Sequence, residues 1–166
     1  MTVEPSEAFA LFYKDNSGPV FRTLLAGTLD RAAAEDATAE AFARAFAHWA
    51  QVADHPNPRA WVLRVAWNYH HSSWRAWERR RVADPPAATP PAADQGIDPD
   101  LVAAIARLPH GQREVLVLAA LGELHPAEIA KVLGKAASTV RGQLSRARAN
   151  LRQTLSAPRG LEEDHD

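Results

Sequence analysis

The chain has 166 residues, of which 46% are apolar, and a formal net charge of −1 at pH 7. That length accommodates one ordinary domain or two small ones, each with a modest core. The sequence has no cysteine, which excludes disulfides and thiolate metal sites. It has no apolar run near the ~20 residues that span a bilayer, and its acidic start does not resemble a signal peptide. We expect a soluble cytoplasmic protein.

The first half of the chain reads as helices, because alanine is abundant and β-branched residues are scarce. Asp30 is a good N-cap for a helix that reaches Trp49, and acidic residues follow in its first turns. Apolar side chains at helical spacing give this helix one inward face: Phe42, Ala45, Phe46 and Trp49. We expect the next residues, 50–57, to form a loop.

Asn57 and Pro58 form a cap and first-turn pair for a second helix that runs towards Arg81. One inward stripe of this helix consists of Trp61, Val65 and Tyr69. Polar residues at offsets of three or four share another face: Arg64, Asn68, His71, Arg75 and Arg79. A third stripe consists of Trp67, His70, Trp74 and Trp77. Whether these rings pack on a neighbouring helix or stack on a ligand stays open, and packing is favoured.

Residues 83–99 contain five prolines and cannot continue a helix or bury a core. They are typical of a semi-extended linker between two domains, and a docking segment for a partner is the alternative. After it, an amphipathic pattern covers 101–108, and another begins near Gln112 and ends before Gly122.

The region after Gly122 has the pattern of two helices joined by a tight turn. Pro126 fits the first turn of a helix that ends at Leu133, and Gly134 suits a turn with positive φ. A second helix follows, with an inward face of Val140, Leu144, Ala147 and Leu151. This is the helix-turn-helix pattern.

Charge is strongly segregated along the chain. Residues 57–82 carry a net charge of +5 and residues 129–158 carry +6 with no acid, while the segments between them are acidic. The outward stripe of the last helix consists of Arg141, Ser145, Arg148 and Arg152. Arginine bonds to phosphates or to guanine edges, so this stripe indicates a DNA-reading helix. The alternative is a solvated basic face.

These residues resemble a known family. LPHGQREVLVLAALGELHPAEIAKVLGKAASTVRGQLSRARANLR is similar to region 4 of bacterial sigma factors, and DRAAAEDATAEAFARAFAHW followed by NPRAWVLRVAWN is similar to their region 2. The order and the Pro-rich linker resemble the extracytoplasmic-function group. The resemblance implies an all-α fold with a region 2-like helical bundle and a region 4-like helix-turn-helix. Its expected divisions are 1–82, the linker 83–99, 100–158 and an acidic tail at 159–166.

The resemblance also implies functional residues and partners. The polar face that docks on the clamp helices of core RNA polymerase would be Asp36, Glu40 and Arg44. The residues that melt and read the −10 element would be Asn57, Arg59, Arg64, Asn68, His71 and Arg75, with a base pocket in the loop 50–57. The residues that read the −35 element would be Ser138, Thr139, Arg141, Gln143, Ser145, Arg146 and Arg148. Region 4 would also contact the polymerase flap.

The chain departs from the family pattern at several positions. Ala39 replaces the usual glutamine of the docking helix. Ala136 replaces the usual serine cap before the recognition helix, so we expect Ser138 or Thr139 to cap a shorter helix. Gly142 lies inside that helix, where it lowers helix stability or allows a close approach to DNA. The promoter sequence and the regulon are not determined by these residues.

Two other functions compete with a transcription initiation factor. A stand-alone helix-turn-helix regulator would bind duplex DNA without polymerase, but the net charge of −1 argues against it. An enzyme is disfavoured because no nucleophile–base pair, phosphate loop or ligand cluster is evident, so we expect no cofactor, metal or small-molecule substrate. An anti-sigma factor that holds the protein at the membrane is compatible with the resemblance. The acidic tail either masks the basic helix or is simply solvated.

Overall fold

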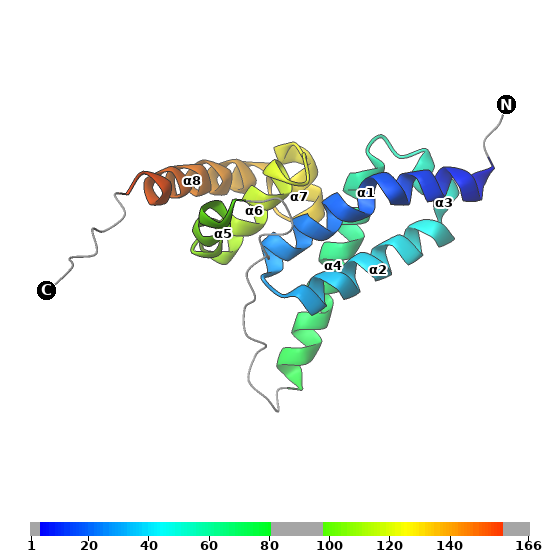
Figure 1. Ribbon diagram of the computed structural model, residues 1–166, viewed down its shortest axis with the longest axis horizontal. Coiled ribbons are helices and arrows are strands. Elements are labelled where there is room, and N and C mark those ends of the chain that lie inside the picture. Colours follow the sequence, from blue (N-terminus) through cyan, green and yellow to red (C-terminus); the bar gives the residue numbers. More distant parts are fainter. Residues whose placement is uncertain (1–3, 81–97, 158–166) are drawn as a thin grey trace, which may run out of the picture.

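The computed structural model describes residues 4–80 and 98–157, and within them every regular element is a helix (Figure 1). This confirms the all-α prediction. The first four helices are α1 (Pro5–Thr28), α2 (Arg31–Ala47), α3 (Trp49–Ala53) and α4 (Pro58–Arg79). The next four are α5 (Pro99–Ala106), α6 (His110–Ala120), α7 (Pro126–Leu133) and α8 (Ala137–Ser156). None of the described helices is long and apolar enough to cross a membrane.

The first domain is built on close contacts of α2 with α1 and α4 (Figure 1). Four fully buried alanines lie along α2: Ala34, Ala37, Ala41 and Ala45. Because these side chains are small, the neighbouring helices can approach α2 closely. Larger buried side chains of the neighbours, such as Leu24 of α1 and Leu63 of α4, fill the remaining space.

Local capping signals set most helix boundaries in this domain. Asp30 caps α2 by accepting a hydrogen bond from the amide of Ala33. Asn57 caps α4 in the same way, with Pro58 in the first turn, as predicted. The prediction of a continuous loop over 50–57 was wrong, because α3 extends to Ala53. The long helix α1, for which the sequence analysis predicted no bounds, continues through Pro19, a residue that is unfavourable inside a helix.

The second domain contains the predicted helix-turn-helix, formed by α7 and α8. Gly134 ends α7 with φ of 65°, the left-handed conformation that favours glycine. The prediction that Ser138 or Thr139 caps the next helix was wrong. The helix α8 begins at Ala137, and its N-cap Ala136 offers no side-chain hydrogen bond. The helix α5 begins at Pro99, within the predicted linker; residues 83–97 of that linker and the tail 159–166 lie outside the described residues.

The two domains pack against each other, which the sequence did not predict. The helix α6 packs on α1, and α7 packs on α4, so one buried apolar cluster runs through both domains. Trp67 of α4 is 1% exposed and belongs to this cluster together with Val117 and Leu118 of α6. The arrangement brings polar side chains of α4 against those of α6 and α7.

Candidate nucleic-acid interface and an interdomain polar cluster

The helix α8 has the two faces that the sequence predicted. Its inward residues Val140, Leu144 and Ala147 are buried against the rest of the second domain. The exposed members of the predicted −35 set are Ser138, Thr139, Arg141, Ser145, Arg146 and Arg148. Gln143 is half-buried and accepts a hydrogen bond of 3.3 Å from Lys135 Nζ. Because α8 contains no acidic residue, its outer face is electropositive and suited to phosphate and base contacts.

The predicted docking face on α2 lies at the surface. Asp36 is exposed, and Glu40 and Arg44 follow at intervals of four on the same side of the helix. Arg44 Nε lies 2.8 Å from Glu40 Oε1, with side chains 51% and 38% exposed. Arg44 also lies 6.0 Å over the ring of Tyr69. The intrahelical ion pair therefore coexists with an accessible polar face.

The predicted −10 residues fall into two groups in the structure. Arg64, Asn68 and Arg75 are exposed on α4. The other three contact neighbouring helices. Asn57 donates a hydrogen bond of 2.8 Å to Glu128 Oε2 of α7. Arg59 donates to Asn16 at 2.8 Å, and its Nη1 lies 3.2 Å from Glu123 Oε2.

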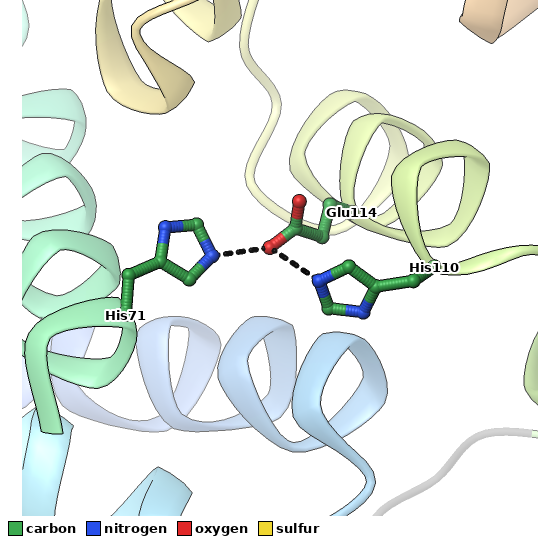
Figure 2. A group of neighbouring side chains, drawn as sticks. All are labelled: His71, His110 and Glu114. Atoms are coloured by element: carbon green, nitrogen blue, oxygen red, sulfur yellow. Dashed lines mark hydrogen bonds and ion pairs between the residues drawn. The ribbon is translucent and has the colours of Figure 1, made fainter. Parts of the chain in front are cut away.

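His71, the third member of that group, belongs to a polar cluster around Glu114 of α6 (Figure 2). The Glu114 side chain is 4% exposed, and its Oε1 lies 2.6 Å from His71 Nε2 and 3.3 Å from His110 Nε2. Trp67 Nε1 donates a hydrogen bond of 2.9 Å to the same oxygen. Because α4 supplies His71 and Trp67 while α6 supplies the other two, the cluster spans the domain contact.

The carboxyl of Glu114 is held in its ionised form. Burial alone would raise its pKa, but hydrogen bonds from His110 and His71, the electrostatic attraction of His110 and the Trp67 bond together hold that pKa well below its ordinary value. Arg113 is adjacent: its guanidinium donates to the carbonyls of Gly27 and Ala106, each at 3.2 Å, so it also links α6 to α1.

The sequence indicates the two residue pairs of this cluster but not that they meet. His110 and Glu114 are four residues apart on α6, and Trp67 and His71 are four apart on α4, so each pair shares a helix face. Nothing in the local sequence indicates that the two pairs meet, since 43 residues separate His71 from Glu114. The sequence alone therefore predicts His71 on a DNA-binding face and indicates no role for Glu114.

A cavity of about 540 Å³ lies beside the cluster, between α4, the end of α1 and the start of α2 and α6. His70, His71 and His110 line it together with Trp74 and Trp77. Burial, followed by the neighbouring His71, lowers the pKa of His70.

The predicted aromatic stripe is partly packed. Trp67 is buried, which agrees with packing, whereas Trp74 is 41% exposed. The rings of Trp74 and Trp77 lie 5.0 Å apart at an interplanar angle of 30°. Packing therefore explains the first turn of the stripe, and its far end stays at the surface.

The sequence matches two family descriptions. Residues 12–81 match Sigma-70 region 2, and residues 100–151 match Sigma-70, region 4. An RNA polymerase sigma-E factor of Streptomyces avermitilis is 32% identical over 128 residues, which cover 75% of this chain and 72% of that protein. The ECF RNA polymerase sigma factor SigL of Mycobacterium tuberculosis is 32% identical over 152 residues, which cover 86% of each chain.

Two solved structures share the fold. The sigma factor RpoE of Bartonella quintana, in complex with the anti-sigma factor NepR, superposes with a TM-score of 0.75 at 23% identity, and 92% of this chain and 99% of that chain are covered. CnrH in complex with the cytosolic domain of CnrY gives a TM-score of 0.61 at 23% identity, covering 93% and 91% of the two chains. At these identities the likeness establishes the helical fold.

Proposed function

This chain belongs to the sigma-70 family, in the extracytoplasmic-function group of RNA polymerase sigma factors, and from that premise we propose how its two domains divide the work. It is a promoter-specific transcription initiation factor that binds core RNA polymerase. In our proposal, the domain of α1–α4 docks on the polymerase clamp helices and opens the −10 element. The domain of α5–α8 then reads the −35 element and contacts the flap.

The outer face of α8 is the observation that carries the proposal for the −35 element. The helix α8 is the second helix of a helix-turn-helix and contains no acidic residue. Its four exposed arginines are Arg141, Arg146, Arg148 and Arg152. In this motif the second helix enters the major groove, where arginine discriminates guanine by paired hydrogen bonds. Because the net charge of the whole chain is −1, the free protein has little nonspecific attraction to DNA. This favours a protein that binds DNA only after it has docked on polymerase.

The face of Asp36, Glu40 and Arg44 on α2 is our proposed polymerase contact. It is polar, exposed and carried on a helix whose opposite face is fixed by buried alanines, so its side chains are presented from a rigid support. Single exposed ion pairs contribute only ~0–1 kcal/mol, so breaking the Glu40–Arg44 pair costs little when both side chains meet a partner.

The exposed residues Arg64, Asn68 and Arg75 of α4 are our proposed first contacts with the freed −10 strand. Arginine binds phosphates and stacks on bases, which suits a separated strand. Asn57, Arg59 and His71 are bonded to other helices in the present arrangement. In our proposal they reach DNA only when the second domain moves away from α4.

The protein acts through binding, in our proposal, without catalysis of its own and beside the polymerase in the cytoplasm. An anti-sigma factor is a further proposed partner, because the structurally similar sigma factor RpoE was solved in complex with the anti-sigma factor NepR. Such a partner would cover surfaces of both domains.

Binding of the purified chain to core RNA polymerase tests the proposed docking face, with Asp36→Arg as the test variant. We expect the unaltered chain to bind tightly and the variant to bind at least about tenfold more weakly, a change of ~1.4 kcal/mol. The substitution removes an acid from the proposed docking face and reverses the charge there, which disrupts electrostatic complementarity with the partner.

Glu35→Arg is the matched control, because it makes the same charge change at an exposed position of the same helix, one residue away and on a different face. We expect it to leave polymerase affinity within about threefold of the unaltered chain. Equal weakening by both substitutions would refute this docking face. No binding by the folded, unaltered chain would refute the proposed function as a whole.

A further inference from the structure

The cluster around Glu114 gathers three metal-ligating side chains at the contact between the domains (Figure 2). The ligand atoms of His71, His110 and Glu114 all lie within 4.8 Å of one another. The carboxylate is buried, in contrast to the exposed acidic groups that commonly gather without an ion. Figure 2 shows both imidazole rings turning a nitrogen towards the same carboxylate oxygen, from helices of different domains.

We propose that His71, His110 and Glu114 form a binding site for a divalent transition-metal ion, with zinc as the best candidate, and that the bound ion ties α4 to α6. Each domain supplies part of the site, so neither domain alone can complete it. Nothing in the regions 2 and 4 matched by this chain assigns a metal to these residues.

The donor set selects the class of metal. Two imidazole nitrogens and one carboxylate oxygen suit zinc, which commonly takes three such protein ligands and a water. Magnesium and calcium prefer oxygen ligands throughout, so two histidines select against them.

One of the three separations between ligand atoms already matches a tetrahedral zinc site. Metal–ligand bonds of ~2.0–2.2 Å place neighbouring ligands roughly 3.3–3.5 Å apart. The 3.3 Å between His110 Nε2 and Glu114 Oε1 lies in that range. The 2.6 Å between His71 Nε2 and Glu114 Oε1 must lengthen by somewhat under one ångström through rotation of the His71 ring, which is 32% exposed. The third separation, between the ligand nitrogens of His71 and His110, is at most 4.8 Å.

The surroundings supply support for the ligands. Trp67 Nε1 donates to Glu114 Oε1, and such outer hydrogen bonds orient ligating carboxylates. Metal bound at His110 Nε2 places the proton of a neutral ring on Nδ1. The weak 3.4 Å contact from Arg113 to that Nδ1 is then given up, while Arg113 keeps both carbonyl acceptors.

The neighbouring cavity of about 540 Å³ supplies an entry path and room for a water as the fourth ligand. His71 and His110 both line it, so an ion can reach the ligands without unfolding either domain. The carboxylate of Glu114 itself is buried.

The bound ion has a consequence for activity that rests on the proposed function. Because His71 lies on α4 among the proposed −10 residues, an ion that ties it to α6 holds that part of α4 against the second domain. The zinc-bound chain should therefore bind core RNA polymerase and promoter DNA more weakly than the zinc-free chain.

The direct test is a metal titration of the full chain, purified without a histidine tag and stripped with a chelator. Zinc is titrated by calorimetry, and cobalt(II) is followed by visible absorption, which reports a tetrahedral environment. We expect one ion per chain. His110→Ala and His71→Ala should each weaken binding at least about tenfold, because even loss of an outer hydrogen bond costs ~10–100-fold.

His125→Ala is the matched control, since it removes an exposed histidine elsewhere and leaves the three ligands intact. It should bind zinc like the unaltered chain. His110 is the most informative position, because its side chain is 61% exposed. Circular dichroism of each variant checks that the helices remain.

The proposal is overturned if the folded chain binds no zinc above the level of His110→Ala, or if the two ligand variants bind as tightly as the control. Polymerase binding with and without zinc is measured separately. Zinc binding without any polymerase binding would refute the proposed function and leave the metal site standing. Polymerase binding by a chain that binds no zinc would refute the metal site and leave the proposed function standing.

Discussion

Trp67 of α4 contacts both α6 and α1. Its indole nitrogen donates to Glu114 of α6, while its ring packs against Gly27 of α1. A Cβ added at Gly27 would lie 2.8 Å from Trp67 Cζ2 and 3.1 Å from Val117 Cγ2. Glycine is required at this position by close approach, because side chains from α4 and α6 occupy the space.

Gly27→Ala should therefore destabilise the protein. Overpacking a filled site costs ~1–3 kcal/mol, and better helix propensity returns at most ~1 kcal/mol near the end of α1. The expected net loss is ~1 kcal/mol in the free energy of unfolding, measured by urea denaturation.

Gly142→Ala is the comparison for that measurement, because it makes the same change inside α8. Its added Cβ would meet only the flexible end of Arg146, at 3.3 Å. The helix should gain up to ~1 kcal/mol. If both glycine variants change the free energy of unfolding in the same direction, close packing at Gly27 does not determine the effect of Gly27→Ala.

At the scale of single elements, α4 and α8 differ in how they begin. Asn57 caps α4 with its side-chain oxygen and also donates to Glu128, so this helix start is anchored twice. The start of α8 has Ala136 at the N-cap, with φ of −66° and ψ of 142°. That extended conformation is what a capping serine adopts, but alanine leaves the first amides without a side-chain acceptor.

Ala136→Ser should stabilise the helix-turn-helix by ~1 kcal/mol, because the new hydroxyl accepts a hydrogen bond from the first turn of α8. Thermal unfolding checks this, with an expected rise in Tm of ~2–4 °C for a chain of this length. Ala136→Val adds bulk without an acceptor and serves as the control. A similar rise in both variants would exclude capping as the cause.

At the scale of the whole molecule, the second domain is held against the first by apolar packing and by several polar contacts. Glu123 precedes α7 and contacts Arg59 of the first domain, while Glu128 lies on α7 and contacts Asn57. The Asn57–Glu128 bond is charge-assisted and part-buried, whereas Glu123 is 76% exposed and contributes less. Separation of the domains should therefore be sensitive to charge at these two positions.

Glu123→Lys combined with Glu128→Lys should increase the population of separated domains by roughly tenfold or more, since about 1.4 kcal/mol of polar contact is lost. The chain has no cysteine, so Val117→Cys in the domain contact gives a single reporter. The rate at which a thiol reagent labels this position measures the open fraction.

Glu7→Lys with Glu35→Lys makes the same charge change at exposed positions of α1 and α2. In the same reporter background this pair should leave the labelling rate unchanged. Equal labelling rates for the two double variants would show that the polar contacts do not control separation of the domains.

Much of the fold was predictable from short-range signals. Asp30, Asn57 and Gly134 mark helix ends because a cap or a left-handed residue acts within three or four positions of itself. The inward face of α8 followed from apolar spacing, which reflects the helical repeat alone. Capping of α8 was mispredicted because the turn after Gly134 positions Ala136 at the cap whatever its side chain offers.

The helical class, the helix-turn-helix and the basic outer face of α8 follow from local sequence, because periodicity, capping and charge are properties of neighbouring residues. The packing of the domains, the His71–Glu114 contact and the Arg59–Glu123 contact emerge only when the helices dock. These contacts join residues 43 and 64 positions apart. They depend on how whole helices dock, and no local pattern encodes which faces of two helices will meet.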